Sequence, residues 1–172
     1  VTLTLPRSAR QPELEPGEAA GRPAAEGAAA HVLLVEDDEE VAALTRAMLD
    51  SLGFAVTHVA SASGAMDALA GGAAFDIVFS DVMLPGGTSG LELARQLRQR
   101  RPELPVVLAT GLVLAAAGAR DEGFPLLLKP YRLEALSATL RDRVSRAVQG
   151  MTGLEVRCLD VTVAGLRHGW QQ

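Results

Sequence analysis

Short apolar runs alternate with stretches of helical periodicity over most of the chain. The runs predict β-strands at residues 31–35, 54–59, 75–80, 105–109 and 126–128. Between them, the spacing of apolar residues predicts helices near residues 62–70 and 90–100, and a short, poorly defined helix after Thr110. Two further helical stripes consist of Val41, Leu44, Met48 and Leu52, and of Leu133, Leu136, Leu140 and Val144. Strands that alternate with helices predict an α/β fold with a doubly wound, mostly parallel sheet.

The two ends of the chain differ in texture from this central part. Residues 9–30 are rich in Ala, Pro, Gly and Glu without apolar periodicity, which is typical of a flexible linker. Residues 1–8 alternate like a short strand that ends at Pro6, and the Val at position 1 suggests a piece of a longer protein. The last helix should fade by about Gly150, and residues 149–172 are interpreted as a tail in which GLEVRCLDVTV could add a strand.

Composition narrows the class of protein. The 172 residues give room for one domain with tails, and 48% apolar with 22% charged residues is an ordinary globular balance. No apolar run approaches the ~20 residues of a membrane-spanning helix, so no direct membrane contact is expected. The single cysteine, Cys158, excludes an internal disulfide framework and fits a cytoplasmic protein. A net charge of −5 argues against a nucleic-acid partner.

Carboxylates follow two of the predicted strands. Glu36 and Asp37 come directly after the first strand, and Asp81 follows the third. In open α/β sheets, function gathers beyond the carboxyl ends of the strands, where strand order reverses, so these acids converge if strands one and three are neighbours. Like charges at short range need a cation, and an all-oxygen site suits Mg²⁺. Asp38 and Glu39 are expected to cap the first helix instead.

Two other strand ends complete the predicted site. Thr110 closes the fourth strand, and Lys129 follows the fifth as the single lysine beside fifteen arginines. A carboxylate can accept a phosphoryl group as an acyl phosphate, and Mg²⁺ with a lysine supplies positioning and charge neutralisation. The residues thus predict a phosphorylation site with Asp81 as the nucleophile.

Four motifs in order resemble those of response-regulator receiver domains, over roughly residues 31–148. They are V-E-D-D at 35–38, S-D-V-M-L-P-G at 80–86, A-T-G at 109–111 and L-L-L-K-P-Y at 126–131. The resemblance implies a flavodoxin-like five-stranded parallel sheet of order 2-1-3-4-5. It also implies that the domain takes a phosphoryl group from the phosphohistidine of a histidine kinase or of a histidine phosphotransfer domain.

The resemblance further implies a role for each matching residue. Asp81 would be phosphorylated and Asp37 would bind Mg²⁺ directly, while Glu36 would act on the metal through water. Met83 would contribute its backbone carbonyl to the metal. The remaining two roles concern the phosphoryl group, which Thr110 would hydrogen-bond and Lys129 would pair with.

Some features depart from the common family pattern or point to a subclass. The family commonly has an aromatic residue three positions before the lysine, and Leu126 stands there. The glycine-rich loop after Asp81 and the short fourth helical segment look most like receivers fused behind histidine kinases. Residues 1–8 resemble the closing strand of a kinase ATP-binding domain. The glycine boxes that bind ATP are absent, so this piece is not expected to phosphorylate itself from ATP.

Three alternatives compete with this interpretation. A flavodoxin-type phosphate binder is disfavoured, because the acidic run 36–40 would repel a phosphate. A phosphohydrolase with an aspartate nucleophile would be expected to carry D-x-D, whereas Val82 and Met83 follow Asp81. A pseudo-receiver that only binds proteins would normally have lost the aspartate or the lysine, and both are present. The hydrolase and the pseudo-receiver stay as alternatives.

Overall fold

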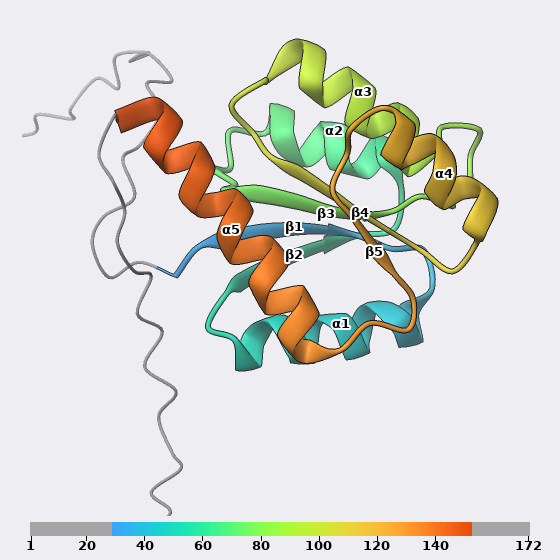
Figure 1. The fold of residues 1–172 in the computed structure, drawn as a ribbon. Helices are drawn as coiled ribbons and strands as arrows, with labels where there is room; N and C mark the ends of the chain where they lie inside the picture. Colours follow the sequence, from blue (N-terminus) through green and yellow to red (C-terminus); the bar gives the residue numbers. More distant parts are fainter. Residues whose placement is uncertain (1–28, 153–172) are drawn as a thin grey trace, which may run out of the picture.

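The computed structural model describes residues 29–152, which form a five-stranded parallel sheet between two layers of helices (Figure 1). The strand order is β2-β1-β3-β4-β5, and every neighbouring pair is parallel. The strands are β1 His31–Val35, β2 Ala55–Val59, β3 Ile77–Asp81, β4 Val106–Thr110 and β5 Leu126–Leu128. The predicted flavodoxin-like, doubly wound sheet is therefore confirmed, with strand bounds within two residues of those expected.

Five helices cover the two faces of the sheet. In Figure 1, α2, α3 and α4 lie on one face, and α1 and α5 lie on the other. Their bounds are α1 Glu39–Ser51, α2 Ala62–Ala70, α3 Gly90–Arg100, α4 Val113–Asp121 and α5 Leu133–Thr152. No helix among residues 29–152 combines the length and the apolar character needed to span a bilayer.

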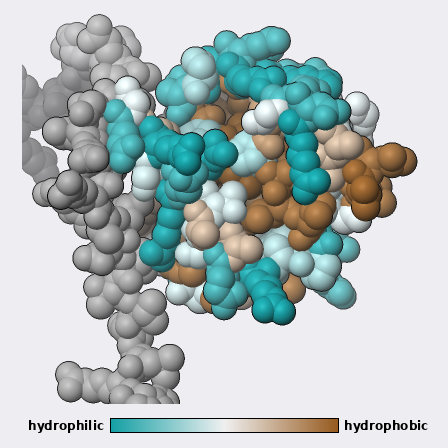
Figure 2. All heavy atoms as spheres, in the orientation of Figure 1, coloured by the Kyte–Doolittle hydropathy of each residue, from teal (hydrophilic) through white to brown (hydrophobic). Residues whose placement is uncertain are grey.

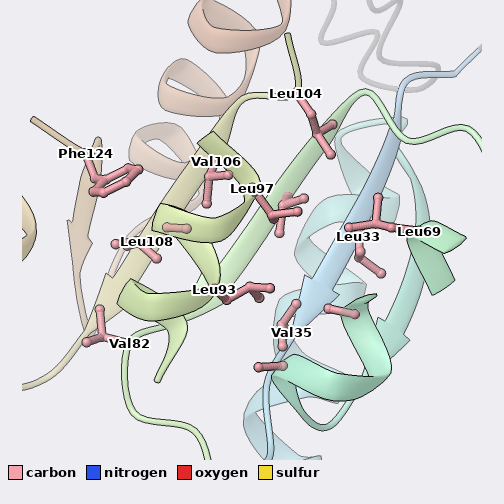
Figure 3. Packing of buried hydrophobic residues seen from close by; sticks show 14 of the residues in the cluster. Leu33, Val35, Leu69, Val82, Leu93, Leu97, Leu104, Val106, Leu108 and Phe124 are labelled. Atoms are coloured by element: carbon pink, nitrogen blue, oxygen red, sulfur yellow. The ribbon is translucent and has the colours of Figure 1, made fainter. Parts of the chain in front are cut away.

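The central strands are apolar except near their ends because both of their faces are buried. Side chains alternate along a strand, so Leu33 and Val35 of β1 point to the helices α2, α3 and α4 (Figure 3). The intervening Val32 and Leu34 pack against α1 and α5. A strand covered on both faces does not alternate between apolar and polar side chains, which accounts for the consecutive apolar residues of these runs.

The inward face of α1 differs from the predicted stripe. Leu44 was expected to lie in the core, but 65% of it is exposed. The buried positions are Ala42, Thr45 and Leu49, which lie one residue further along each turn. Small side chains at the first two positions let the helix approach the sheet closely, and hydropathy alone cannot reveal such a face.

The stripe on α5 is confirmed at three positions and fails at the first. Leu136, Leu140 and Val144 are buried, whereas Leu133 is 37% exposed at the start of the helix. The helix ends at Thr152, two residues beyond the predicted end at Gly150.

The expectation of a poorly defined fourth helix was wrong. The helix α4 is regular over nine residues, as long as α2. It packs through Ala116 and Ala119, and its preceding residue Leu112 has no side chain able to cap it. The apolar surface at the right of Figure 2 lies at this end of α4, where Val113 is 80% and Leu114 is 89% exposed. The helix is thus held by small residues and leaves its large ones in solvent.

The far end of α4 is held by charge. Arg95 of α3 donates two hydrogen bonds to the carboxylate of Glu122, the residue that follows α4. Arg98 donates to the backbone oxygen of Glu122 and lies 4.1 Å from the centre of the Phe124 ring. The first turn of α4 has no such attachment among the polar contacts of residues 29–152 apart from the hydrogen bond from Leu112 N to Thr110.

The expectations for the chain ends fall mostly outside the described residues. Residues 1–28 and 153–172 are not described. They include the proposed remnant strand at 1–8, nearly all of the linker at 9–30 and the possible strand that begins at Gly153.

A very close backbone approach joins α3 to the strand that carries Asp81. A Cβ added at Gly90 would lie 1.8 Å from the backbone oxygen of Asp81 and 2.7 Å from Oγ of Ser80. The Gly90 N–H also donates to the backbone oxygen of Val82. Only glycine fits at this position, so it fixes where α3 begins relative to Asp81.

We expect Gly90→Ala to lower the free energy of unfolding by about 3 kcal/mol, since the new methyl group must displace backbone rather than a flexible side chain. Urea unfolding followed by circular dichroism measures this. The matched control is Gly118→Ala in α4, where the nearest atom, Cδ2 of Leu91, would lie 3.8 Å away. That change should instead raise the free energy of unfolding by roughly 0.5–1 kcal/mol, because alanine in a helix loses less conformational freedom on folding than glycine does. Equal effects of the two substitutions would contradict the close approach.

Candidate functional site

The parallel neighbours β1 and β3 bring the predicted acids together. Val35 pairs with Ser80, so the residues that follow them leave the sheet side by side. One carboxylate oxygen from each of Glu36, Asp37 and Asp81 lies within 4.8 Å of the other two. Glu36 is 4% exposed, whereas Asp37 is open to solvent. The structure thus groups the three predicted carboxylates at the carboxyl ends of the strands.

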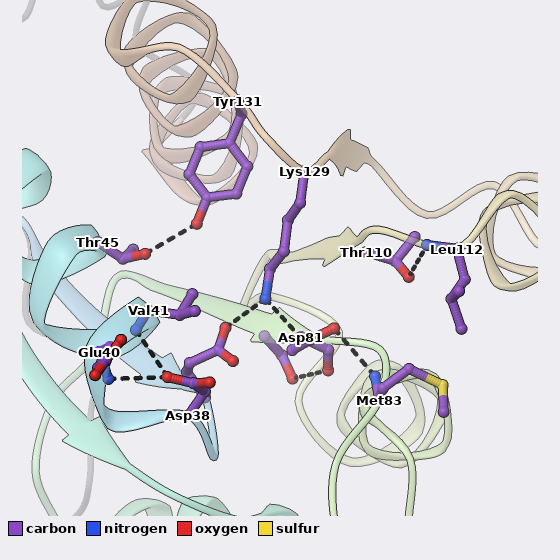
Figure 4. Close-up of polar contacts among 12 residues, drawn as sticks. Asp38, Glu40, Val41, Thr45, Asp81, Met83, Thr110, Leu112, Lys129 and Tyr131 are labelled. Atoms are coloured by element: carbon purple, nitrogen blue, oxygen red, sulfur yellow. Dashed lines mark hydrogen bonds and ion pairs between the residues drawn. The ribbon is translucent and has the colours of Figure 1, made fainter.

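Lys129 reaches into this group from the end of β5 (Figure 4). Its Nζ donates to Oδ2 of Asp81 and to Oε2 of Glu36, both at 2.6 Å. The backbone N–H of Lys129 donates to the carbonyl of Thr110, which continues the β4–β5 pairing and fixes where the side chain starts. The ammonium therefore neutralises negative charge that would otherwise repel across the site.

Burial and charge act in opposite directions on these groups. Burial raises the pKa of Glu36 above its ordinary value, although the hydrogen bond and charge of Lys129 oppose this shift. Burial would lower the pKa of Lys129, but the hydrogen bonds to Asp81 and Glu36 outweigh it, so its pKa is raised. Lys129 consequently stays protonated at neutral pH. Losing one partner of such a buried pair typically costs ~3–5 kcal/mol, since a charge is left uncompensated.

Thr110 and Met83 lie at the same rim but have other partners. The Thr110 side chain is fully buried, and its Oγ1 accepts a hydrogen bond of 3.1 Å from the backbone N–H of Leu112. The Met83 N–H donates to Oδ1 of Asp81 at 3.1 Å, while its side chain is 55% exposed. Both carboxylate oxygens of Asp81 are therefore held, one by Lys129 and the other by the backbone of the following loop.

Asp38 caps α1, as the sequence predicts. Its Oδ1 accepts from the backbone N–H groups of Glu40 and Val41, and its side chain turns away from Asp81 (Figure 4). Two consecutive aspartates thus have different tasks, because Asp37 contributes to the acidic group and Asp38 satisfies the free N–H groups of the helix start.

The turn that carries Lys129 is also joined to α1. Tyr131 lies two residues after Lys129, and its hydroxyl shares a hydrogen bond of 2.9 Å with Oγ1 of Thr45. Its ring meets Phe79 of β3 edge-on, with centroids 5.7 Å apart. Burial raises the pKa of Tyr131, and the hydrogen bond with Thr45 acts against that shift. Three elements therefore meet at this ring.

Sequence reasoning missed two residues next to the site. Tyr131 ends the motif L-L-L-K-P-Y, which does not reveal its contact with Thr45, whereas Gly90 was expected as the first residue of the helix at 90–100. No signal marked Thr45, because a threonine inside a helix is usually a surface residue. His58 was correctly expected in a strand, and its Nε2 lies 2.7 Å from the backbone oxygen of Glu36.

Comparison with known proteins identifies the family. Residues 32–141 match the family model of the response regulator receiver domain. The chain therefore belongs to this family, whose members accept a phosphoryl group in two-component signal transduction. This membership sets the phosphohydrolase alternative aside.

Relatives of known sequence and structure agree. The chain is 36% identical over 121 residues to an uncharacterized transcriptional regulatory protein, YkoG, of Bacillus subtilis, covering 64% of this chain and 49% of that protein. It is 32% identical over 121 residues to the sensor kinase CckA of Brucella abortus, covering 68% of this chain and 13% of the kinase. The signal receiver domain of an HD domain-containing protein from Pseudomonas fluorescens superposes with a TM-score of 0.67 at 25% identity, over 74% of this chain and 95% of that domain. The chain thus spans about half or less of these two curated relatives.

The two aspartates after β1 can be separated by stability without metal. We expect Asp38→Ala to lower the free energy of unfolding by about 1 kcal/mol, because two N–H groups of α1 lose their acceptor. Asp37→Ala serves as the matched control and should change it by less than about 0.5 kcal/mol, as an exposed residue outside the helix. Denaturant unfolding in the presence of a chelator measures both. A larger loss for Asp37→Ala would reverse the assignment of the two residues.

Proposed function

We propose that this receiver domain is phosphorylated on Asp81, with Mg²⁺, by the phosphohistidine of a histidine kinase or of a histidine phosphotransfer domain. The observation that carries the proposal is the position of Lys129, whose ammonium lies 2.6 Å from oxygens of both Asp81 and Glu36. A site built only for protein binding has no need of a cation held among three converging carboxylates.

The transfer requires a nucleophile that attacks phosphorus and a leaving group whose negative charge is neutralised by a proton. An oxygen of Asp81 attacks phosphorus as the bond from phosphorus to the histidine nitrogen breaks, and the departing imidazole nitrogen takes up a proton. The phosphoryl group adds about −1.5 to −2 charge to the site. Lys129 is already at hydrogen-bond distance from Asp81 and can pair with the added oxygens. The Thr110 hydroxyl, now bonded to Leu112 N–H, is the neutral donor we assign to a phosphoryl oxygen.

The donor set fits a hard divalent cation. Glu36, Asp37 and Asp81 offer carboxylate oxygens within 4.8 Å of one another, which is the chemistry that Mg²⁺ prefers. We assign Asp37 and Asp81 as direct ligands, Glu36 as a residue that acts through water, and Met83 as the source of a backbone carbonyl. When bound, the ion supplies charge neutralisation for phosphoryl transfer.

The larger protein is proposed to be a hybrid histidine kinase that acts in the cytoplasm. Similarity to a segment of the sensor kinase CckA supports this, together with the resemblance of residues 1–8 to a kinase strand. The transcriptional regulatory protein YkoG is also similar, so the coding sequence upstream of position 1 distinguishes the two contexts. A dimerisation and ATP-binding region there would support the kinase, and a DNA-binding region downstream would overturn it. The net charge of −5 leads us to propose no nucleic-acid partner for this piece itself.

Labelling with a small phosphodonor tests the central assignment. Incubated with acetyl phosphate and Mg²⁺, the wild-type protein should gain one phosphoryl group that is lost in acid and base, and Asp81→Asn should gain none. Asp50→Asn, an exposed carboxylate of α1, is the control and should label like the wild type. Intact-protein mass spectrometry reads the result. Undiminished labelling of Asp81→Asn would refute the assignment, and absence of labelling in the wild type would favour a pseudo-receiver.

Metal titration tests the ligand assignment. We expect Asp37→Ala to raise the Mg²⁺ concentration for half-saturation roughly tenfold or more, because a direct ligand is removed. Asp38→Ala should change it less than about twofold, since that side chain is committed to the helix cap. Isothermal titration calorimetry of the two variants decides the matter, and equal losses would show that the wrong aspartate has been assigned to the metal.

A further inference from the structure

Next to the site, the buried hydroxyl of Thr45 is hydrogen-bonded to the half-buried Tyr131, and neither residue takes part in the chemistry proposed above. Thr45 is 2% exposed on the inner face of α1, between Ala42 and Leu49. The partner of its hydroxyl is the hydroxyl of Tyr131, at 2.9 Å. A buried hydroxyl without a hydrogen bond destabilises the folded state, so Thr45 depends on Tyr131 as its partner.

The pair joins the two segments that supply opposite charges to the site. The helix α1 starts at Glu39, directly after the acidic residues 36–38, and Thr45 lies in its second turn. Tyr131 follows Lys129 by two residues, and only Pro130 stands between them. The hydrogen bond therefore connects the helix that follows Glu36 to the turn that follows Lys129. The side chains of Glu36 and Lys129 themselves form an ion pair at 2.6 Å.

The same ring contacts the strand of the nucleophile. Tyr131 packs edge-on against Phe79 of β3, and Phe79 lies two residues before Asp81 on that strand. A backbone hydrogen bond also restrains Lys129 itself, because its N–H donates to the carbonyl of Thr110 of β4. The long side chain of Lys129 begins from a turn that is fixed at both ends, which lowers the number of places its ammonium can occupy.

From this geometry we propose that Thr45 and Tyr131 are positioning residues for the phosphorylation of Asp81. Their hydrogen bond holds the turn 129–131 against α1 and so keeps the Lys129 ammonium between Glu36 and Asp81. The inference rests on the proposed function, since Lys129 must be placed where it can pair with the incoming phosphoryl group. Neither hydroxyl contacts the reacting atoms, and each acts through the placement of Lys129.

The test uses Thr45→Val, Tyr131→Phe and the double variant, each in the full chain. Tyr131→Phe leaves the buried hydroxyl of Thr45 without its partner, and Thr45→Val removes the partner of the half-buried Tyr131 hydroxyl. Both singles should therefore unfold at lower urea concentration than the wild type, Tyr131→Phe more so than Thr45→Val. The double variant replaces the pair by two apolar groups of similar shape, and its unfolding midpoint should return toward that of the wild type. Stability and positioning are thereby separated in one set of proteins.

The rate of phosphorylation by acetyl phosphate at saturating Mg²⁺ is then measured for all of them. We expect roughly a threefold to tenfold loss in both singles and the same loss in the double variant, because all three lack one and the same hydrogen bond. Thr45→Ser keeps the hydroxyl and should recover most of the rate. The Mg²⁺ concentration for half-saturation should stay within about twofold of the wild type, since no metal ligand is touched.

Ser51→Ala is the matched control, because Ser51 also lies on α1 and its hydroxyl donates to the backbone of Met48, away from Lys129. It should phosphorylate like the wild type. Recovery of the rate in the double variant along with its stability would show that the pair serves packing only and would overturn the inference, as would unchanged rates in the singles. Such a result would leave the proposed function intact, which fails separately if Asp81→Asn is still labelled.

Discussion

The ion pair of Lys129 with Glu36 and Asp81 is the interaction on which the site depends. The parallel pairing of β1 with β3 forces carboxylates from both strand ends into a small volume, and their mutual repulsion opposes folding there. One ammonium, delivered by β5 on the far side of β4, offsets that repulsion at 2.6 Å from two of the three acids. The strand order decides which carboxyl ends lie next to one another. The residues that follow those ends decide the chemistry.

Much of the fold follows from periodicity and chain direction. The strands β1 and β5 begin and end at the expected residues, because each apolar run is bounded at its end by a charged residue such as Glu36 or Lys129. The predicted acidic group also depends on the strand ends alone, so the structure brings it together as anticipated. Metal binding, phosphorylation and the separate role of each residue remain predictions, since they concern bound partners that the chain does not contain.

What could not be predicted concerns close packing and small residues. The inner face of α1 is formed by Ala42 and Thr45 rather than by Leu44, because the distance to the sheet and not hydropathy decides which side chain fits. The fourth helix was underestimated for a related reason. Its alanines and glycine carry little pattern, yet Ala116 and Ala119 pack well and an arginine network at Glu122 holds its far end. The partnership of Thr45 with Tyr131 joins positions 86 residues apart, and no local pattern contains it.

The contact at Gly90 has a consequence for any redesign of this domain. Since the backbone of α3 rests directly on the carbonyl of Asp81, position 90 admits only glycine, and the start of the helix is fixed relative to that aspartate. The opening turn of α4 stands at the other extreme, with Val113 and Leu114 turned into solvent and no side chain capping it. Sequence changes meant to spare the site are therefore tolerated best around Val113 and Leu114, whereas any side chain at position 90 would displace the backbone next to Asp81.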